Sequence, residues 1–236
     1  MTSAVLKTKR GPEVGIGLGP GRATLDFCRT FSSLLAGYSE PVKLKLVAIS
    51  AGCPADEPEY ASTSFFNLFP AYVVDSKVGL FAESLVPVKA FAEIQGRAGV
   101  SEAFAARASI DLVVTSMGDV RDEHDLLCKF LRQSSKQGVG RGLPRECIGN
   151  VQYRPYTAKG AVEEKPGDLR AVTLYELEDL VRIAGQKNKH VILIARQCGM
   201  CERTRAEAMR PLLTNPSLKV FSTLVMDAAT AKELLA

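Results

Sequence analysis

The sequence has little that would mark a membrane protein or a secreted protein. Its longest uninterrupted apolar run, residues 191–195, is far shorter than the roughly 20 residues that a membrane-spanning helix needs. The first ten residues are polar and basic and lack the apolar segment of a secretory signal peptide, so we expect no such signal. We therefore expect a cytoplasmic protein with no membrane partner.

Excess charge of one sign is also lacking. Thirty Lys and Arg against 26 Asp and Glu give a net charge of +4, and Lys7, Lys9 and Arg10 supply most of it. Without a large cationic field, sequence-independent binding to nucleic acid is not expected to be the main function. With 46% apolar and 24% charged residues, the 236-residue chain is an ordinary globular one with enough material for a sizeable core.

Cysteine and histidine are scarce. Six cysteines do not make a disulfide scaffold in a chain of this length, so we expect reduced thiols. Cys198-Gly-Met-Cys201 has the spacing of a redox pair, but residues 202–236 are too few to complete a thioredoxin fold. A zinc knuckle would need a second pair of ligands, whereas the remaining candidates look isolated: Cys28, Cys53, Cys128, Cys147, His124 and His190. We expect no metal and no cofactor, and interpret Cys198 and Cys201 as loop residues over a ligand pocket; a reversible disulfide remains open.

Short β-branched runs alternate with longer amphipathic stretches, which is typical of βα units. The pattern predicts strands at 14–18, 44–50, 111–116, 191–195 and 220–225, and helices at 23–36, 91–107, 174–183 and 228–235, the last with Asp227 as its N-cap. Loops are expected at 134–144 and 155–167. The expected fold class is α/β: a mostly parallel sheet flanked by helices, Rossmann-like, with a small lid subdomain left open. We predict a flexible segment at 1–12 and one domain at 13–236.

The most informative segment is the glycine-rich stretch at 14–24, VGIGLGPGRAT, where a predicted strand turns into a predicted helix. Such a turn lets backbone amides approach an anion, and the helix N-terminus adds positive partial charge. Arg22 and Thr24 are suitable donors to a phosphate. The named nucleotide motifs do not fit, because no frame matches G-x-G-x-x-G and no lysine stands at the Walker position. A tight turn that needs glycine for backbone reasons alone is the alternative, and we favour the anion site.

With these pieces in place, the chain resembles the effector-binding domain of SorC/DeoR-type bacterial sugar regulators, a relative of the ribose-phosphate and glucosamine-phosphate isomerase folds. The segment 14–24 is similar to the family's VGVGWGRT turn, and 111–119 (DLVVTSMGD) to its DLALVGIG strand. Towards the end, 172–180 (VTLYELEDL), 205–209 (RAEAM) and 224–235 (LVMDAATAKELL) are similar to the family's IGI-LEDL, KAEAI and LITDE-TA-LL segments. The likeness runs over nearly the entire chain.

The resemblance implies a phosphorylated sugar bound at the carboxyl ends of the strands. Phosphate would be held by Gly19, Gly21, Arg22, Thr24 and Arg205, and sugar hydroxyls would face Gly118, Asp119 and Asn150. Arg205 stands where the family has a lysine, and Asn150, in 148–151 (IGNV), where it usually has an aspartate. The family also implies a homo-dimer or tetramer.

The regulators carry a helix-turn-helix module ahead of this domain. About a dozen residues precede the first predicted strand, too few for such a module. Contact with DNA is therefore expected only through a part absent from this chain; the alternative is a stand-alone sensor of a sugar phosphate that does not touch DNA.

Two charged stretches carry weaker signals. Asp122, Glu123 and Asp125 are interpreted as a solvated helix start, because acids are favoured in a first turn, while Asp119 is given a ligand-contact role. The basic residues Arg132, Lys136, Arg141 and Arg145 are interpreted as a solvated loop.

Two functions are therefore weighed. The first is a binding domain that senses a phosphorylated sugar and has no catalytic residues. The alternative is an aldose–ketose sugar-phosphate isomerase, in which Asp119 would move a proton beside the sugar carbonyl. The isomerase signatures DGADE and KGGG do not occur in the sequence, and a shared fold does not transfer activity, so we favour the binding domain.

Overall fold

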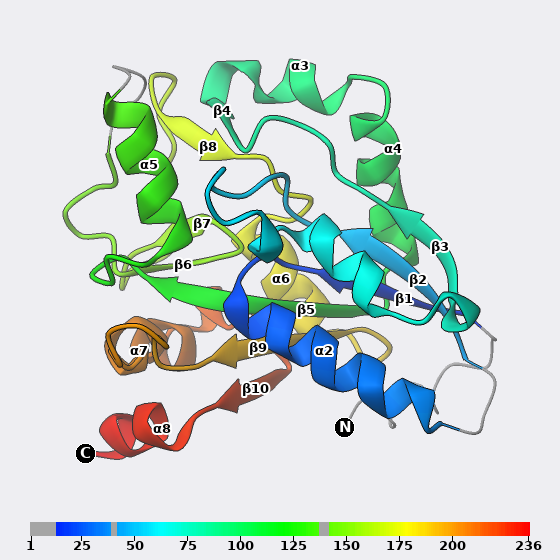
Figure 1. The fold of residues 1–236 in the computed structure, drawn as a ribbon. Coiled ribbons are helices and arrows are strands. Elements are labelled where there is room, and N and C mark those ends of the chain that lie inside the picture. Colours follow the sequence, from blue (N-terminus) through cyan, green and yellow to red (C-terminus); the bar gives the residue numbers. More distant parts are fainter. Residues whose placement is uncertain (1–12, 39–41, 137–141) are drawn as a thin grey trace.

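The computed structural model describes residues 13–38, 42–136 and 142–236. Its centre is a parallel sheet in the order β10-β9-β5-β1-β2-β3 (Figure 1). The strands are β1 (Glu13–Leu18), β2 (Lys43–Ala48), β3 (Val74–Val78), β5 (Leu112–Asp119), β9 (His190–Ala195) and β10 (Thr223–Met226). The predicted segment 1–12 lies outside the described residues.

Helices cover both faces of this sheet. In Figure 1, α2 crosses the front of the sheet and α6 lies behind it, which gives the layered arrangement expected for parallel strands. The helices are α2 (Arg22–Ala36), α3 (Phe91–Gln95), α4 (Val100–Ala105), α5 (Leu126–Lys136), α6 (Leu177–Ala184), α7 (Ala206–Thr214) and α8 (Ala228–Leu235). Among the described helices, none is long and apolar enough to cross a membrane.

The main core lies between the sheet and these helices. Five of the six residues of β1 are buried, and the inner residues of β2, β5 and β9 are buried as well, because each strand is covered on both faces. The buried face of α2, which includes Leu25, Cys28 and Phe31, packs against this sheet. The expected α/β fold with a mostly parallel sheet is confirmed.

Short antiparallel strands extend this sheet at the end of β5 and form a second, separate sheet. Strand β6 (Gly149–Val151) pairs with the end of β5 and with β7 (Arg154–Tyr156), while β4 (Leu85–Pro87) pairs with β8 (Leu169–Ala171). A second, smaller hydrophobic core joins α5 to this region through Leu127, Phe130, Leu131, Tyr153 and Ala171.

The predicted strands are all present, but two predicted helices differ from the structure. The stretch 91–107 is two helices, because α3 ends at Gly96 and Gly99, with φ 79°, begins α4. The helix predicted at 174–183 starts later, at Leu177. The Leu174 N–H donates instead to Ile49 O at 2.9 Å, and Glu176 N–H donates to the Asp179 carboxylate at 3.1 Å as the helix begins.

The predicted N-cap of α8 is confirmed. Asp227 accepts hydrogen bonds from the Thr230 backbone N–H at 2.8 Å and from the Gln197 N–H at 2.7 Å, so it also fixes the loop after β9. We expect Asp227→Ala to lower the free energy of unfolding by about 1 kcal/mol, within the range known for N-cap removal. Urea unfolding measures this value. The matched control, Glu163→Ala at an exposed position, should stay within about 0.5 kcal/mol of the wild type, and equal values for the two variants would contradict the cap.

Candidate functional site

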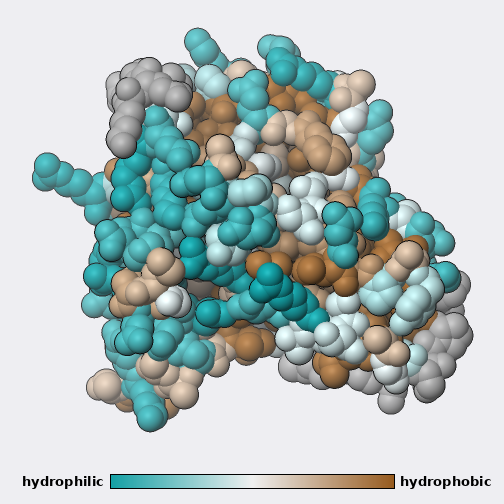
Figure 2. Space-filling view, viewed as in Figure 1, coloured by the Kyte–Doolittle hydropathy of each residue, from teal (hydrophilic) through white to brown (hydrophobic). Residues whose placement is uncertain are grey.

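A cleft opens at the carboxyl ends of β1, β5 and β9. From β1 the chain first adds β2 and β3 on one side of β1, and then adds β5, β9 and β10 on the other side. The direction in which strands are added therefore reverses between β1 and β5. Ligands of open α/β sheets bind at such a switch point. The cleft encloses about 710 Å³ of empty space, a figure that includes space open to solvent. Its surroundings, at the left of Figure 2, are mostly hydrophilic.

Three segments form the walls of this cleft. The first is the turn between β1 and α2, the second is the end of β5 with the following loop and the β6–β7 hairpin, and the third is the loop after β9. The lining includes Gly21, Arg22, Ser116, Gly118, Asp122, His124, Asp125, Asn150, Gln152, Tyr153, Arg196, Gln197, Cys198 and Arg205.

The first wall presents the N-terminus of α2. Gly21, the residue before the helix, has φ 110°, and a Cβ there would lie 2.7 Å from Ser116 Oγ, so both conformation and space require glycine. Among the described residues, no side chain caps the N-terminus of α2. The first-turn N–H groups that lack intrahelical acceptors therefore point out of the helix at the cleft, with the positive end of the helix dipole.

Arg22 stands at the rim of this wall. Its guanidinium donates to Glu57 Oε1 at 2.9 Å and lies 4.8 Å from the centre of the Tyr60 ring, and about a third of its side chain is exposed. Glu57 also pairs with Lys129 Nζ at 2.8 Å. Arg22 is thus oriented at the mouth of the cleft and keeps donors that a ligand can reach.

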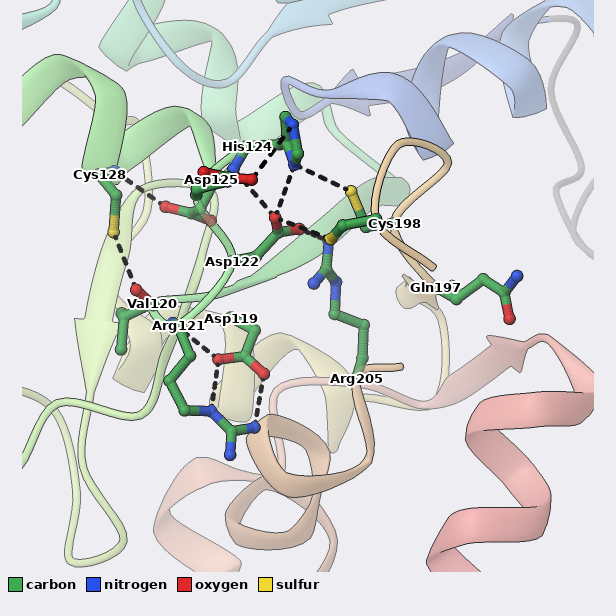
Figure 3. Close-up of polar contacts among 12 residues, drawn as sticks. Asp119, Val120, Arg121, Asp122, His124, Asp125, Cys128, Gln197, Cys198 and Arg205 are labelled. Carbon is green, nitrogen blue, oxygen red and sulfur yellow. Dashed lines mark hydrogen bonds and ion pairs between the residues drawn. The ribbon is translucent and has the colours of Figure 1, made fainter. Parts of the chain in front are cut away.

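Arg205, at the start of α7, reaches from the opposite wall (Figure 3). It is buried, and its Nη2 donates to Asp122 Oδ2 at 2.7 Å. Burial disfavours the Asp122 carboxylate, but hydrogen bonds from the His124 backbone N–H and from Arg205 outweigh it and hold the pKa of Asp122 well below its usual range. In the described part of the chain, Arg205 Nε and Nη1 have no hydrogen-bond partner.

The floor of the cleft is a buried polar pair. Asn150 Nδ2 donates to Asp125 Oδ2 at 3.0 Å, and Asp125 Oδ1 accepts from the Cys128 N–H at 2.9 Å as α5 begins. Burial raises the pKa of Asp125. A Cβ on Gly118 would lie 1.8 Å from Asp125 Oδ2, so glycine is needed for this pair to form.

The β6–β7 hairpin adds a strained turn beside that pair. Its two turn residues, Gln152 and Tyr153, both have positive φ, 45° and 68°, as a type I′ turn requires, although neither is glycine. Gln152 Nε2 donates to Tyr175 O at 2.9 Å, while its buried Oε1 has no partner among the described residues. Strain of this kind concentrates at functional sites, and here it places Gln152 in the cleft wall.

Five of the eight predicted site residues line the cleft: Gly21, Arg22, Gly118, Asn150 and Arg205. The other three are placed elsewhere. Gly19 and Thr24 are buried against the chain, with Gly19 N–H donating to Val114 O at 2.8 Å and Thr24 Oγ1 lying 3.4 Å from Pro20 O. Asp119 is fully buried, and Arg121 holds it at 3.0 and 2.7 Å through Nε and Nη2 (Figure 3).

We expected the acidic residues around His124 to form a solvated helix start, and this prediction is wrong at two positions. Both Asp122 and Asp125 are buried. Arg205 compensates the charge of Asp122, and Asp125 accepts hydrogen bonds from the Asn150 amide and the Cys128 backbone N–H. Only Glu123 is exposed as expected. The basic stretch predicted as a loop is partly helical, since α5 runs to Lys136, and Arg141 lies outside the described residues.

Sequence reasoning missed several lining residues: Ser116, Asp122, His124, Gln152, Arg196 and Gln197. The rule that ligands bind beyond the carboxyl ends of parallel strands would have pointed to 196–198, which follow a correctly predicted strand. Nothing in the local pattern marks Gln152, which reaches the cleft through an unpredicted hairpin.

No family model and no curated protein matches the sequence. Solved structures do. The full-length sorbitol operon regulator SorC from Klebsiella pneumoniae is 19% identical with a TM-score of 0.65, over 99% of this chain and 68% of its own. A probable sor operon regulator from Shigella flexneri is 17% identical with a TM-score of 0.64, over 100% and 85%. The chain has the fold of these regulators.

A domain of a possible sugar-binding transcriptional regulator from Arthrobacter aurescens has the same fold, with 12% identity and a TM-score of 0.60 over 98% of this chain and 83% of its own. The resemblance to SorC/DeoR-type regulators is thereby confirmed at the level of the fold, over nearly the whole chain. The identities are low, so the residues of the cleft have to carry any conclusion about a ligand.

Proposed function

We propose that this chain is a sensor domain that binds a small phosphorylated sugar in the cleft. The single observation that carries the proposal is Arg205, a buried guanidinium with two unpartnered donors in the wall of a cleft that also receives the uncapped N-terminus of α2. A buried donor without an acceptor costs about 1–3 kcal/mol, and an anion in the cleft would remove that cost.

The hydrogen-bond donors around the cleft favour an anion with several oxygens. Arg22, Arg196 and Arg205 line it, and the partners of all three are single carboxylates: Glu57, Asp26 and Asp122. A phosphate offers several acceptor oxygens, so it can take the remaining guanidinium donors and the first-turn amides of α2 together. A neutral ligand would leave these donors without acceptors.

The polar floor suits the sugar end of such a ligand. Asn150 and Asp125 lie beside Gly118, and Gln152 Oε1 is a buried acceptor without a partner in the described ranges. Hydroxyl groups both donate and accept, so they match this mixture of amides and a carboxylate. The phosphate would therefore lie towards α2 and Arg205, and the hydroxyls towards the β6–β7 hairpin.

Sensing fits the solved structures of the same fold, which belong to transcriptional regulators. In that role a dimer or tetramer of this chain would respond to the sugar phosphate, and contact with DNA would come from a separate module. The isomerase hypothesis gains no support from the cleft, since Asp119, its proposed base, is buried away from the lining and held by Arg121.

The proposal predicts a thermal shift with the right ligand. The panel contains pentose and hexose phosphates carrying the phosphate on the first or the last carbon, the matching free sugars, and inorganic phosphate. A ligand at 100 times its dissociation constant stabilises the native state by about 2.7 kcal/mol, which for a chain of this size raises the melting temperature by about 5–10 °C. Free sugars should give no shift.

Arg22→Gln tests the site directly. Loss of charge-assisted hydrogen bonds to the phosphate should weaken binding about 10- to 100-fold by calorimetry, because each is worth about 1.5–3 kcal/mol. The matched control is Arg97→Gln, just after α3, another arginine paired to one glutamate, Glu93 at 2.9 Å, but exposed and away from the cleft. No shift with any phosphorylated sugar, or equal loss in both variants, would refute the proposal.

A further inference from the structure

Four side chains with metal-ligating atoms meet on one wall of the cleft. They are Asp122 and His124, from the loop between β5 and α5, and Cys198 and Cys201, from the loop after β9. One donor atom from each lies within 4.8 Å of all the others. The two loops are 74 residues or more apart in sequence, so only the fold brings these donors together.

The distances match a tetrahedral centre. His124 Nδ1 lies 3.1 Å from Asp122 Oδ1 and 3.6 Å from Cys198 Sγ, and Cys201 Sγ lies 3.5 Å from Asp122 Oδ1. Zinc bonds of about 2.0–2.1 Å to N and O and about 2.3 Å to S place tetrahedral ligands about 3.3 Å apart for an N–O pair and about 3.5 Å apart for an S–N or S–O pair. These three separations agree with those values, and the remaining pairs of donor atoms lie within 4.8 Å of each other.

We propose that Asp122, His124, Cys198 and Cys201 bind one zinc ion. Thiolate, imidazole and carboxylate are all ligands that zinc takes in proteins, and Cys-x-x-Cys is a usual spacing of two zinc ligands. Four protein donors leave no open position, so the site is structural and not hydrolytic. Binding releases the two thiol protons to solvent.

The surroundings compensate the charge of such a centre. Zinc with two thiolates and one carboxylate carries one net negative charge, and the Arg205 guanidinium lies against Asp122 Oδ2 at 2.7 Å. Asp122 Oδ1 is oriented by the His124 backbone N–H at 2.9 Å. Residues that hydrogen-bond to a metal ligand in this way fix the orientation of that ligand and tune the affinity of the site for the metal. Figure 3 shows Arg205, Asp122, His124 and Cys198 converging on this point.

The cysteine loop is held in the shape that the site needs. Cys198 N–H donates to Arg203 O at 2.8 Å, Glu202 N–H donates to Cys198 O at 2.9 Å, and Glu202 takes φ 57°. Because Cys198 and Arg205 both line the cleft, a zinc ion here would tie the two loops that form its walls and fix Arg205. This site runs against the expectation of no metal, which treated His124 as isolated. It does not depend on what the cleft binds.

The test is metal content and coordination of the full chain purified under reducing conditions. We expect about one zinc per chain by elemental analysis, and X-ray absorption with two sulfur scatterers at about 2.3 Å and two lighter ones at about 2.0–2.1 Å. Cobalt in place of zinc should give the charge-transfer and ligand-field bands of a tetrahedral dithiolate. These readouts use the metal alone, so they are independent of sugar binding.

Cys201→Ser is the decisive variant, because Cys201 is exposed and its loss removes no core packing. Mutation of a residue that only hydrogen-bonds to a zinc ligand lowers zinc affinity roughly 10- to 100-fold. Because Cys201 is proposed as a direct ligand, the zinc affinity of Cys201→Ser should fall by more than this, and we expect the same of His124→Ala. The matched control, Cys53→Ser, changes a cysteine outside the cluster and should keep the metal. A Cys198–Cys201 disulfide under reducing purification, no zinc, or zinc retained by both ligand variants would overturn the proposal.

Discussion

Arg205→Met should lower the free energy of unfolding by about 3–5 kcal/mol and abolish binding of phosphorylated ligands. The substitution keeps most of the apolar volume of the side chain but leaves Asp122, 1% exposed, without its cation. Removing one partner of a buried ion pair costs this much because the remaining charge is neither solvated nor compensated. It also deletes the donors at Nε and Nη1 that we assign to the phosphate.

Chemical unfolding with a chelator present measures the first effect, so that bound metal contributes nothing. In the double variant Asp122→Asn/Arg205→Met the orphaned charge is gone, and we expect part of the stability to return while ligand binding stays lost. Arg97→Met, at an exposed arginine, is the control and should change stability by less than about 0.5 kcal/mol. If the double variant is no more stable than Arg205→Met, the buried-charge explanation is wrong.

Gly118→Ala should destabilise the protein by about 1–3 kcal/mol and weaken ligand binding as well. The added Cβ would meet Asp125 Oδ2 at 1.8 Å and Asn150 Nδ2 at 2.6 Å, so the buried amide–carboxylate pair has to move. Overpacking of a buried site costs this amount, and here it also disrupts the hydrogen bond that forms the floor of the cleft.

Thermal unfolding and calorimetric titration measure the two effects of Gly118→Ala. Gly167→Ala is the matched control, since a Cβ at Gly167 meets nothing within 4 Å, and it should be neutral or slightly stabilising. Comparable stabilities for the two variants would mean that the contact at Gly118 relaxes freely and that the floor of the cleft is not rigid.

The first turn illustrates how far a local pattern reaches. The strand, the glycine-rich turn and α2 were predictable, because alternating burial, glycine and helical spacing are properties of adjacent residues. Which residues of that turn face the cleft was not predictable. Gly19 and Thr24 pack inward while Gly21 and Arg22 line the opening, and the neighbouring strand β5 decides between them.

The acidic run around His124 illustrates the opposite case. Taken alone, charged residues before a helix favour a solvated first turn. In the fold, Asp122 meets Arg205 from 83 residues away and Asp125 meets Asn150 from 25 residues away, so both become buried. Long-range compensation of a charge has no signature in the local sequence.

The sequence by itself determined the α/β class, the positions of five of the six parallel strands (all but β3), and the resemblance to sugar regulators, because periodicity and turn chemistry are encoded in neighbouring residues. Only the tertiary structure decided which polar side chains share the cleft and that two loops bring together an aspartate, a histidine and two cysteines. The physical reason is that burial, charge pairing and coordination depend on distances in space, and the parallel sheet sets these by aligning strand ends that lie far apart along the chain.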